Sequence, residues 1–284
     1  MIYQAADILR NSNSYLENTN EVEWVLSHIL NCDRAELYCE ERILSEDQYD
    51  NFRNLLSDRK KGIPLQYLLG NISFMGFEFI VRPGVFIPRP ETELLVEEAI
   101  DLLKLNFAGD GDFCPKILDL CSGCGNIGIS LTKLRSNSII ISSDISKTAI
   151  STTQANAKRH GCDKRLKAIQ SDLFKGLEGE GLFDIILSNP PYVRSEDVAS
   201  SLPVELGHEP KAAFDGGDDG LFFYRCIIEE SPAFLKKGGF LVMEVGFDQA
   251  EDIEDLLRAE SSFEIVKVRQ DYAGIERIIV ANLR

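Results

Sequence analysis

The amino-acid sequence predicts an α/β protein in which a small helical domain precedes a mostly parallel sheet. From residue 115 onward, short apolar runs alternate with helical patterns, which is typical of a sheet with helices on both faces. A glycine-rich turn at residues 123–128 follows the first of these runs. The first seventy residues carry only helical patterns, so we expect a separate domain there.

The helical domain is predicted at residues 1–70. Apolar residues between 21 and 30 recur at the spacing of one helix face. Ser45 and Gln48 have the spacing of a capping box, so a further helix is expected to begin there and to end before Pro64. Seven basic and twelve acidic residues give the first seventy residues a net charge of −5.

A short hairpin is predicted to connect the two domains at residues 71–85. Phe74, Phe77 and Phe79 lie on either side of Gly76, which is typical of two strands joined by a tight turn. Pro83 and Gly84 close the segment. The remaining residues, 86–284, are then the α/β domain.

Seven strands are expected in this domain. They are predicted at residues 117–120, 138–142, 167–170, 184–188, 240–245, 264–268 and 276–280. Ligands of such sheets bind beyond the carboxyl ends of the strands. The glycine turn, Asp144, Asp172 and Asn189 all fall at such ends. Four candidate features therefore converge on one rim of the predicted sheet.

Composition limits the classes of partner and compartment. The net charge of −16 disfavours stable nucleic-acid binding, because a phosphate backbone is held mainly by Lys and Arg. No apolar run approaches the ~20 residues of a membrane span, and residues 1–20 lack the apolar core of a signal peptide. Seven scattered cysteines favour reduced thiols. We therefore expect a cytoplasmic protein with a protein partner and no membrane association.

The glycine turn could bind either a dinucleotide or S-adenosylmethionine. The residues from Gly123 to Gly128 match the G-x-G-x-x-G pattern, and the following helix offers free amides. Asp119 precedes the turn, where a carboxylate would repel a pyrophosphate but suits the ammonium of a methionine moiety. Asp144 suits two ribose hydroxyls as a double acceptor. The pattern favours S-adenosylmethionine over NAD.

Cys121 and Cys124 form a C-x-x-C pattern within the same turn. A redox dithiol is one interpretation, since a helix N-terminus can lower the pKa of a thiol. A zinc site is another, but it would need two further ligands, and no second such pair occurs. The interpretation that we favour is that small residues fill a crowded ligand turn, and we expect no metal.

Asn189-Pro190-Pro191-Tyr192 is the most specific motif and closes the fourth predicted strand. An amide nitrogen is a poor nucleophile, so its methylation depends mainly on orientation. The Asn189 side-chain oxygen and the Pro190 carbonyl can each accept one hydrogen from a planar NH2 group. Pro191 stiffens the backbone, and Tyr192 can stack on the amide.

Together, these motifs make the sequence resemble the HemK/PrmC family of release-factor glutamine methyltransferases over nearly its whole length. The resemblance also includes further segments outside the glycine turn and the Asn-Pro-Pro-Tyr motif. They are residues 64–70, 86–93 and 172–174, Glu209-Pro210, Gly216-Gly217, Asp219 to Leu221, Tyr224-Arg225, Asp271, Gly274 and Arg277.

The resemblance implies a helical substrate-recognition domain followed by a Rossmann-like, seven-stranded S-adenosylmethionine-dependent methyltransferase domain. It implies methylation of the glutamine in the Gly-Gly-Gln motif of class I peptide chain release factors. The motifs and the resemblance together assign cofactor contacts to Asp119, Cys121, Ser122, Gly123, Cys124, Gly125, Asp144, Asp172, Leu173 and Asn189. Catalytic roles fall to Asn189, Pro190 and Tyr192, which with Pro191 hold the substrate glutamine.

The sequence departs from the family pattern in two places. Cys121 and Cys124 stand where glycine and a small hydroxyl residue are more frequent, and Leu173 stands where an aromatic residue is often found. Neither departure removes a catalytic atom, so both bear on cofactor affinity.

Three other functions remain open at this point. A planar NH2 group also occurs on adenine, so a nucleic-acid adenine methyltransferase is an alternative, although it would need a basic channel. Glutamine methylation of a ribosomal protein is a closer one. A non-catalytic protein with a relic cofactor fold is disfavoured, because Asp119, Asp144 and Asn189 are all present.

Overall fold

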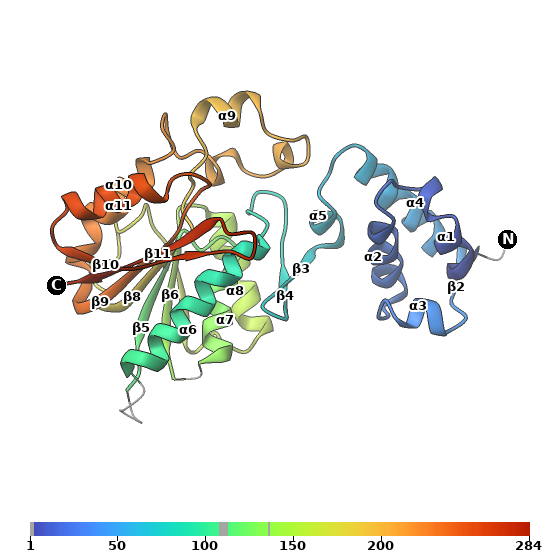
Figure 1. Cartoon of the computed structure of the whole chain (residues 1–284). Helices are drawn as coiled ribbons and strands as arrows, with labels where there is room; N and C mark the ends of the chain where they lie inside the picture. Colours follow the sequence, from blue (N-terminus) through green and yellow to red (C-terminus); the bar gives the residue numbers. More distant parts are fainter. Residues whose placement is uncertain (1–2, 108–112, 136) are drawn as a thin grey trace. The chain divides into compact units, whose positions relative to one another are not determined.

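A computed structural model describes residues 3–107, 113–135 and 137–284 (Figure 1). Residues 1–2 of the predicted helical domain, and residues 108–112 and 136 of the predicted α/β domain, lie outside this description. The contacts divide the chain into two compact units. One extends to Asn71 and also includes the segment Pro203–His208, and the other holds Ile72–Leu202 and Glu209–Arg284.

The first unit is mainly helical, as predicted. Its elements are β1 (Tyr3–Gln4), α1 (Ala5–Arg10), η1 (Ser12–Ser14), α2 (Thr19–Leu30), α3 (Glu36–Cys39), β2 (Ile43–Leu44), α4 (Glu46–Lys60), α5 (Leu65–Leu69) and η3 (Leu206–His208). The short antiparallel pair of β1 and β2 was not predicted, because two-residue strands carry no periodicity. The capping box is confirmed: Ser45 Oγ accepts from the Gln48 backbone N–H, and Gln48 Oε1 accepts from that of Ser45.

Apolar side chains from several helices form the core of this unit. Val22, Val25 and Leu26 of α2 and Phe52 of α4 are almost fully buried. The segment 203–208 joins the unit through the Arg59 guanidinium, which pairs with Glu21 at 2.7 Å and with Glu205 at 2.6 Å. Since 203–208 lies far from the first seventy residues in sequence, this unit is not one continuous stretch of chain.

The hairpin connector consists of β3 (Asn71–Phe74) and β4 (Phe77–Ile80). Both turn residues, Met75 and Gly76, have positive φ, of 50° and 73°, as the tight turns that match the strand twist require. Asn156 fastens β4 to the neighbouring domain. Its Oδ1 accepts from Ile80 N at 2.7 Å, and its Nδ2 donates to Ile80 O at 3.0 Å and to Cys124 O at 2.9 Å.

The predicted seven-stranded, mostly parallel sheet is confirmed. Its strands are β5 (Lys116–Leu120), β6 (Ile139–Asp144), β7 (Leu166–Gln170), β8 (Phe183–Ser188), β9 (Leu235–Glu244), β10 (Phe263–Gln270) and β11 (Glu276–Leu283). Their order is β10-β11-β9-β8-β5-β6-β7. The last five strands in this order run parallel, and β11 is antiparallel to both of its neighbours.

One strand begins earlier than predicted. β9 starts at Leu235, so Gly238 and Gly239 lie inside it rather than before it. The pairing of β8 with β9 shifts register between Phe183 and Ile185, and Gly238 has φ of 75°. These features indicate a bulge that the glycines permit, which no local pattern distinguishes from a turn.

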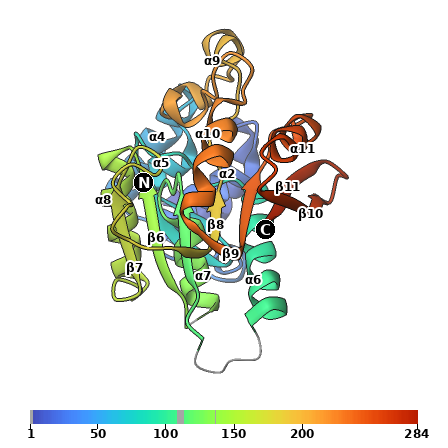
Figure 2. The same cartoon turned by 90° about the vertical axis from the view of Figure 1, so that its left-hand side faces the viewer.

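Helices cover both faces of the sheet (Figures 1 and 2). On one face lie α6 (Glu93–Phe107), α7 (Asn126–Leu134) and α8 (Lys147–Arg159). On the other lie α10 (Phe222–Glu230) and α11 (Ala250–Ala259), and α10 is seen in front of the strands in Figure 2. Shorter helices are η2 (Pro90–Thr92), α9 (Ser195–Ser200), η4 (Lys211–Ala213) and η5 (Ser231–Ala233). Among the described helices, none is both long and apolar enough to cross a lipid bilayer.

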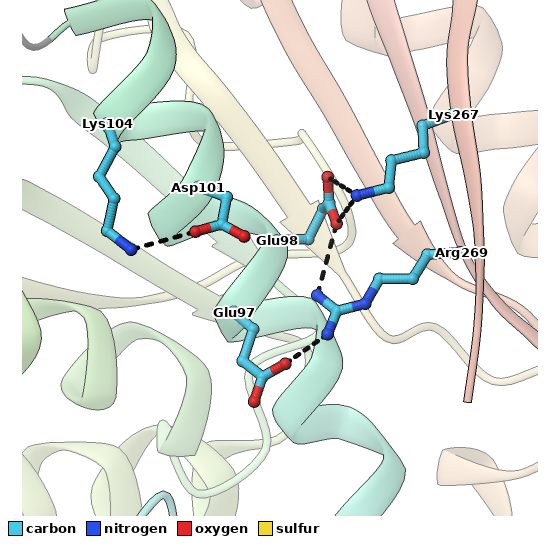
Figure 3. Close-up of polar contacts among 6 residues, drawn as sticks. All are labelled: Glu97, Glu98, Asp101, Lys104, Lys267 and Arg269. Atoms are coloured by element: carbon cyan, nitrogen blue, oxygen red, sulfur yellow. Dashed lines mark hydrogen bonds and ion pairs between the residues drawn. The ribbon is translucent and has the colours of Figure 1, made fainter. Parts of the chain in front are cut away.

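An ionic network fixes α6 to the edge strand β10 (Figure 3). The buried Glu98 carboxylate accepts from Lys267 Nζ at 2.7 and 3.0 Å and from Arg269 at 3.4 Å. Arg269 also pairs with Glu97. Because α6 follows directly on η2, this network also helps to hold Thr92, the last residue of η2, against the sheet.

Candidate active site at the carboxyl rim of the sheet

The carboxyl ends of β5, β6 and β8 meet at the point where the strand order reverses. The chain runs from β5 outward through β6 to β7 and then returns to β8 on the opposite side of β5. Ser122 N donates to Ser143 O at 2.9 Å, and Ser188 Oγ donates to Leu120 O at 3.0 Å. Such a reversal point is where open α/β sheets bind ligands. The structure thus brings the glycine turn, Asp144 and Asn189 to one rim.

The turn after β5 adopts the positive φ angles that its glycines permit. Cys121, Gly123 and Gly125 have positive φ, of 62°, 55° and 80°. At Cys121 this conformation is unfavourable for a residue with a Cβ. Gly128 is needed for space: a Cβ there would lie 2.6 Å from Ser142 Oγ and 2.9 Å from Asp119 Oδ2. The turn is therefore packed directly against the strands.

Asp119 braces this turn and keeps one oxygen free. The residue is fully buried, and its Oδ2 accepts from Gly128 N at 3.0 Å and from Ser142 Oγ at 3.1 Å. Its Oδ1 is buried and finds no hydrogen-bond partner in the part of the chain that the structure describes. Burial raises the pKa of the carboxyl to about 7, against the lowering effect of these two hydrogen bonds. A buried acceptor of this kind fits a cationic donor such as an ammonium group.

Asp144 joins the turn to the following helix. Its Oδ2 accepts from Gly123 N at 2.9 Å and its Oδ1 from Ser146 N at 2.8 Å. Burial raises the pKa of the carboxyl despite these bonds. Each carboxylate oxygen can accept a second hydrogen bond, so the pair of oxygens can also receive two neighbouring hydroxyls.

The two cysteines of the turn are free thiols held in their neutral form. Burial raises the pKa of Cys124 to about 12 and the pKa of Cys121 well above its usual range. The nearby charges of Asp144 and Asp119 act in the same direction. A redox dithiol needs a lowered pKa, so this environment favours the space-filling interpretation.

We therefore expect the Cys121→Ser/Cys124→Ser variant to keep its methyl-transfer activity within about 3-fold, because neither thiol ionises near neutral pH. The measurement is kcat before and after mild peroxide treatment, for wild type and variant. Peroxide sensitivity that the variant lacks would instead identify a thiol switch.

The segment after β7 has a strained backbone at Leu173 and an exposed carboxylate at Asp172. Leu173 has φ of 49°, and Ser171 Oγ donates to its carbonyl oxygen at 2.6 Å. The Asp172 side chain is exposed and pairs with Lys175 at 2.7 Å. A cofactor contact from this segment would therefore come from Leu173 or the backbone more readily than from the Asp172 carboxylate.

The Asn189-Pro190-Pro191-Tyr192 segment is clamped on several sides. Asn189 Nδ2 donates to Thr92 Oγ1 at 3.1 Å, and Gln249 Nε2 donates to the Tyr192 carbonyl at 3.0 Å. Three glycines also approach Tyr192. A Cβ at Gly216, Gly220 or Gly246 would lie 2.7, 2.5 or 2.9 Å from Tyr192 atoms. The segment is thus preorganised before any substrate binds.

Sequence reasoning missed three side chains at this site: Thr92, Gln249 and Glu244. Glu244 ends β9, only 2% exposed, and burial raises the pKa of its carboxyl to about 7. Burial, followed by the nearby Glu244 charge, raises the pKa of Tyr192 to about 12. The signal that could have revealed Glu244 is its acidic side chain at the end of an apolar strand predicted to share the sheet.

Another missed feature is a buried ion pair behind the segment 86–93. The Glu209 carboxylate accepts from Ile87 N at 2.8 Å and from Arg89 at 2.5 Å. The Arg89 guanidinium lies 4.5 Å from the Phe86 ring centroid. Both partners fall in segments that carry the family resemblance, and the contact joins two segments that are distant in sequence.

Comparisons with known proteins identify the family of this chain. The PrmC N-terminal domain model matches residues 1–70, and the Methyltransferase small domain model matches residues 77–218. The release factor glutamine methyltransferase of Clostridium acetobutylicum is 34% identical over 284 residues, covering 99% of this chain and 96% of that protein. That of Geobacter sulfurreducens is 37% identical over 260 residues, covering 91% and 87%.

The fold itself is shared with more distant enzymes. The catalytic domain of hMettl16, solved in complex with a MAT2A 3′UTR hairpin, superposes with a TM-score of 0.58. The two are 12% identical, and the match covers 84% of each chain. The α/β domain therefore has a methyltransferase fold.

Proposed function

Because the chain belongs to the release factor glutamine methyltransferase family, we propose that it methylates the side-chain amide nitrogen of the Gly-Gly-Gln glutamine in class I peptide chain release factors. The methyl donor in this proposal is S-adenosylmethionine. The observation that carries the proposal is the fixed Asn189 amide, whose Nδ2 is engaged by Thr92. Its Oδ1 is left to accept a hydrogen from the substrate.

The rim residues fit the proposed cofactor. The unpartnered Asp119 Oδ1 can accept from the ammonium of the methionine moiety, and Asp144 can receive the two ribose hydroxyls. The turn between Cys121 and Gly125 would lie along the amino-acid part, and Leu173 would lie against the adenine. When bound, the cofactor supplies an electrophilic methyl group on a sulfonium.

The chain's own contribution to the chemistry is orientation. Asn189 Oδ1 and the Pro190 carbonyl each accept one N–H of the substrate amide, which directs the nitrogen lone pair along the line of transfer. Tyr192 stacks on the amide plane and, with its raised pKa, stays a neutral phenol. With the cofactor bound, transfer of its methyl group to this nitrogen would be followed by loss of one amide proton to solvent.

We predict that the protein binds S-adenosylmethionine and not NAD, and that it methylates intact class I release factor. Calorimetry with both cofactors checks the first statement. Transfer of a labelled methyl group to release factor checks the second, with a Gly-Gly-Gln to Gly-Gly-Ala release factor as the matched control. Tighter binding of NAD, or equal labelling of the control, would contradict the proposal.

The same assay separates the alternatives. A ribosomal protein with an accessible glutamine and an adenine-containing RNA serve as competing acceptors. The net charge of −16 disfavours the RNA, since its backbone would meet few cations. We place the reaction in the cytoplasm, in keeping with the seven free thiols.

A further inference from the structure

Glu244 is a buried carboxylate beside the substrate motif, and the proposed function leaves it without a role. It is the last residue of β9, whose Met243 pairs with Ser188 of the neighbouring parallel strand. Glu244 therefore lies level with Asn189, at the rim where the glutamine would bind. It is 2% exposed, and burying a carboxylate costs free energy unless the charge is paired or hydrogen-bonded.

The carboxylate interacts with polar groups on one side only. The Thr92 hydroxyl and the Asn189 amide lie beside it and, as hydrogen-bonding neighbours, both lower its pKa. The other oxygen, Oε2, is buried and has no hydrogen-bond partner among the described residues. Asn189 Nδ2 also donates to Thr92 Oγ1 at 3.1 Å. Glu244, Thr92 and Asn189 thus form one small connected network.

The direction of the hydrogen bonds in this network follows from the acceptor-only character of a carboxylate. An ionised Glu244 can only accept, so Thr92 Oγ must donate its hydrogen to it. The Thr92 oxygen then accepts from Asn189, and only Nδ2 of the Asn189 amide can donate. The oxygen and nitrogen of an amide occupy equivalent positions after a 180° flip, so such a network decides which atom faces the substrate.

We propose that Glu244 is a positioning residue, which acts with Thr92 to hold the Asn189 amide with Oδ1 facing the substrate glutamine. This role rests on the proposed function, since it needs an NH2 group to be oriented. Without Glu244 the amide can flip and present Nδ2, a donor, to the donor hydrogens of the substrate. The flipped form cannot hold the glutamine nitrogen in line.

The state of Glu244 responds to pH because several charged or titratable groups surround it. Arg277 of β11 favours the carboxylate, whereas Glu91 of η2 opposes it, and Tyr192 and Tyr224 also face it. Burial is the largest influence and brings the pKa to about 7. Above this pH the group is ionised and accepts. Below it the carboxyl carries an O–H, so the network can reverse and kcat should fall.

The test compares wild type with Glu244→Gln and Thr92→Val in the full-length protein. At pH 8.0 with saturating cofactor and intact release factor, we expect kcat to fall about 10- to 100-fold in each variant, as for other groups that orient a functional side chain. The wild-type kcat should decline below pH ~7, and this decline should be absent in Glu244→Gln. Cofactor affinity, from calorimetry, should change by less than about 3-fold.

Thermal unfolding distinguishes positioning from a structural role. The pKa of Glu244 is higher in the folded than in the unfolded protein, so its ionised form opposes folding above about pH 5, increasingly as pH rises toward 7. Glu244→Gln should therefore unfold at the same or a higher temperature at pH 8 while turning over more slowly. A lower unfolding temperature with an unchanged kcat per folded molecule would show a purely structural role and overturn the proposal.

The remaining outcomes separate the two proposals. An active wild type, with Glu244→Gln equally active and equally dependent on pH, overturns the role of Glu244 alone. A wild type that methylates no release factor overturns the proposed function and this role with it.

Discussion

Replacing Asn189 with alanine should lower kcat on release factor by about 100-fold or more. The loss of one preorganised hydrogen-bonding group at a reacting centre costs on the order of ~3 kcal/mol in the transition state. Alanine also leaves Thr92 and Glu244 without the Nδ2 donor that they share. The measurement is single-turnover methyl transfer at saturating cofactor, with circular dichroism to show that the variant is folded.

Two further variants sharpen this test. Asn189→Asp keeps the acceptor oxygen but loses the donor to Thr92 and adds a charge beside the buried Glu244, so it should also be slow. Asn282→Ala is the matched control: Asn282 donates to the Gly238 carbonyl at 2.8 Å, at the opposite end of β9 from Glu244. It should keep wild-type kcat. Turnover of Asn189→Ala near that of wild type would refute the assigned role.

Much of the fold could be predicted because its signals are local. Most strands of the sheet contain a short apolar run with flanking turns that are visible in the chain, and the Ser45 capping box depends on residues three apart. β8 is buried along its whole length, and Ile185, Ile186 and Leu187 form a continuous apolar run at its centre. The glycine turn and the Asn189 motif were located for the same reason, since each follows directly on such a run.

The contacts of the site that could not be predicted depend on which strands become neighbours in the sheet. Glu244 meets Asn189 only because β9 lies beside β8, although 55 positions separate the two residues in the sequence. Thr92 and Gln249 reach the motif from a 3-10 helix and a helix start that share no pattern with it. Likewise, Asp119 was expected to face a ligand, yet its Oδ2 already accepts hydrogen bonds from Gly128 and Ser142 inside the fold.

Removal of the helical domain should raise the Michaelis constant for intact release factor by about 10-fold or more, with little change for a short Gly-Gly-Gln peptide. We propose that this domain recognises the substrate protein, which a peptide is too small to engage. A 10-fold change corresponds to ~1.4 kcal/mol of lost binding, well within what a few interface side chains supply. The measurement is the Michaelis constant of both substrates for the full chain and for a form that begins at residue 71.

The truncated form needs its own control, because residues 203–208 pack with the helical unit. Deletion leaves Glu205 without Arg59 and Val204 without Gly62. Unchanged cofactor affinity and a cooperative unfolding transition would show that the α/β domain remains intact. Full activity on the peptide would show in addition that the Asn189 motif is undisturbed.

Charge should contribute to recognition by the helical domain. Its net charge of −5 would attract a glutamine loop that carries positive charge, as a loop working against ribosomal RNA should. Complementary charges mainly raise the encounter rate and are screened within ~8 Å at physiological salt. The Michaelis constant for release factor should therefore rise with salt in the full chain and respond less in the truncated form.

If the truncated enzyme methylates intact release factor as efficiently as the full chain, the helical domain has no recognition role. The assignment of Asn189 to Tyr192 would stand, because these residues lie in the other unit.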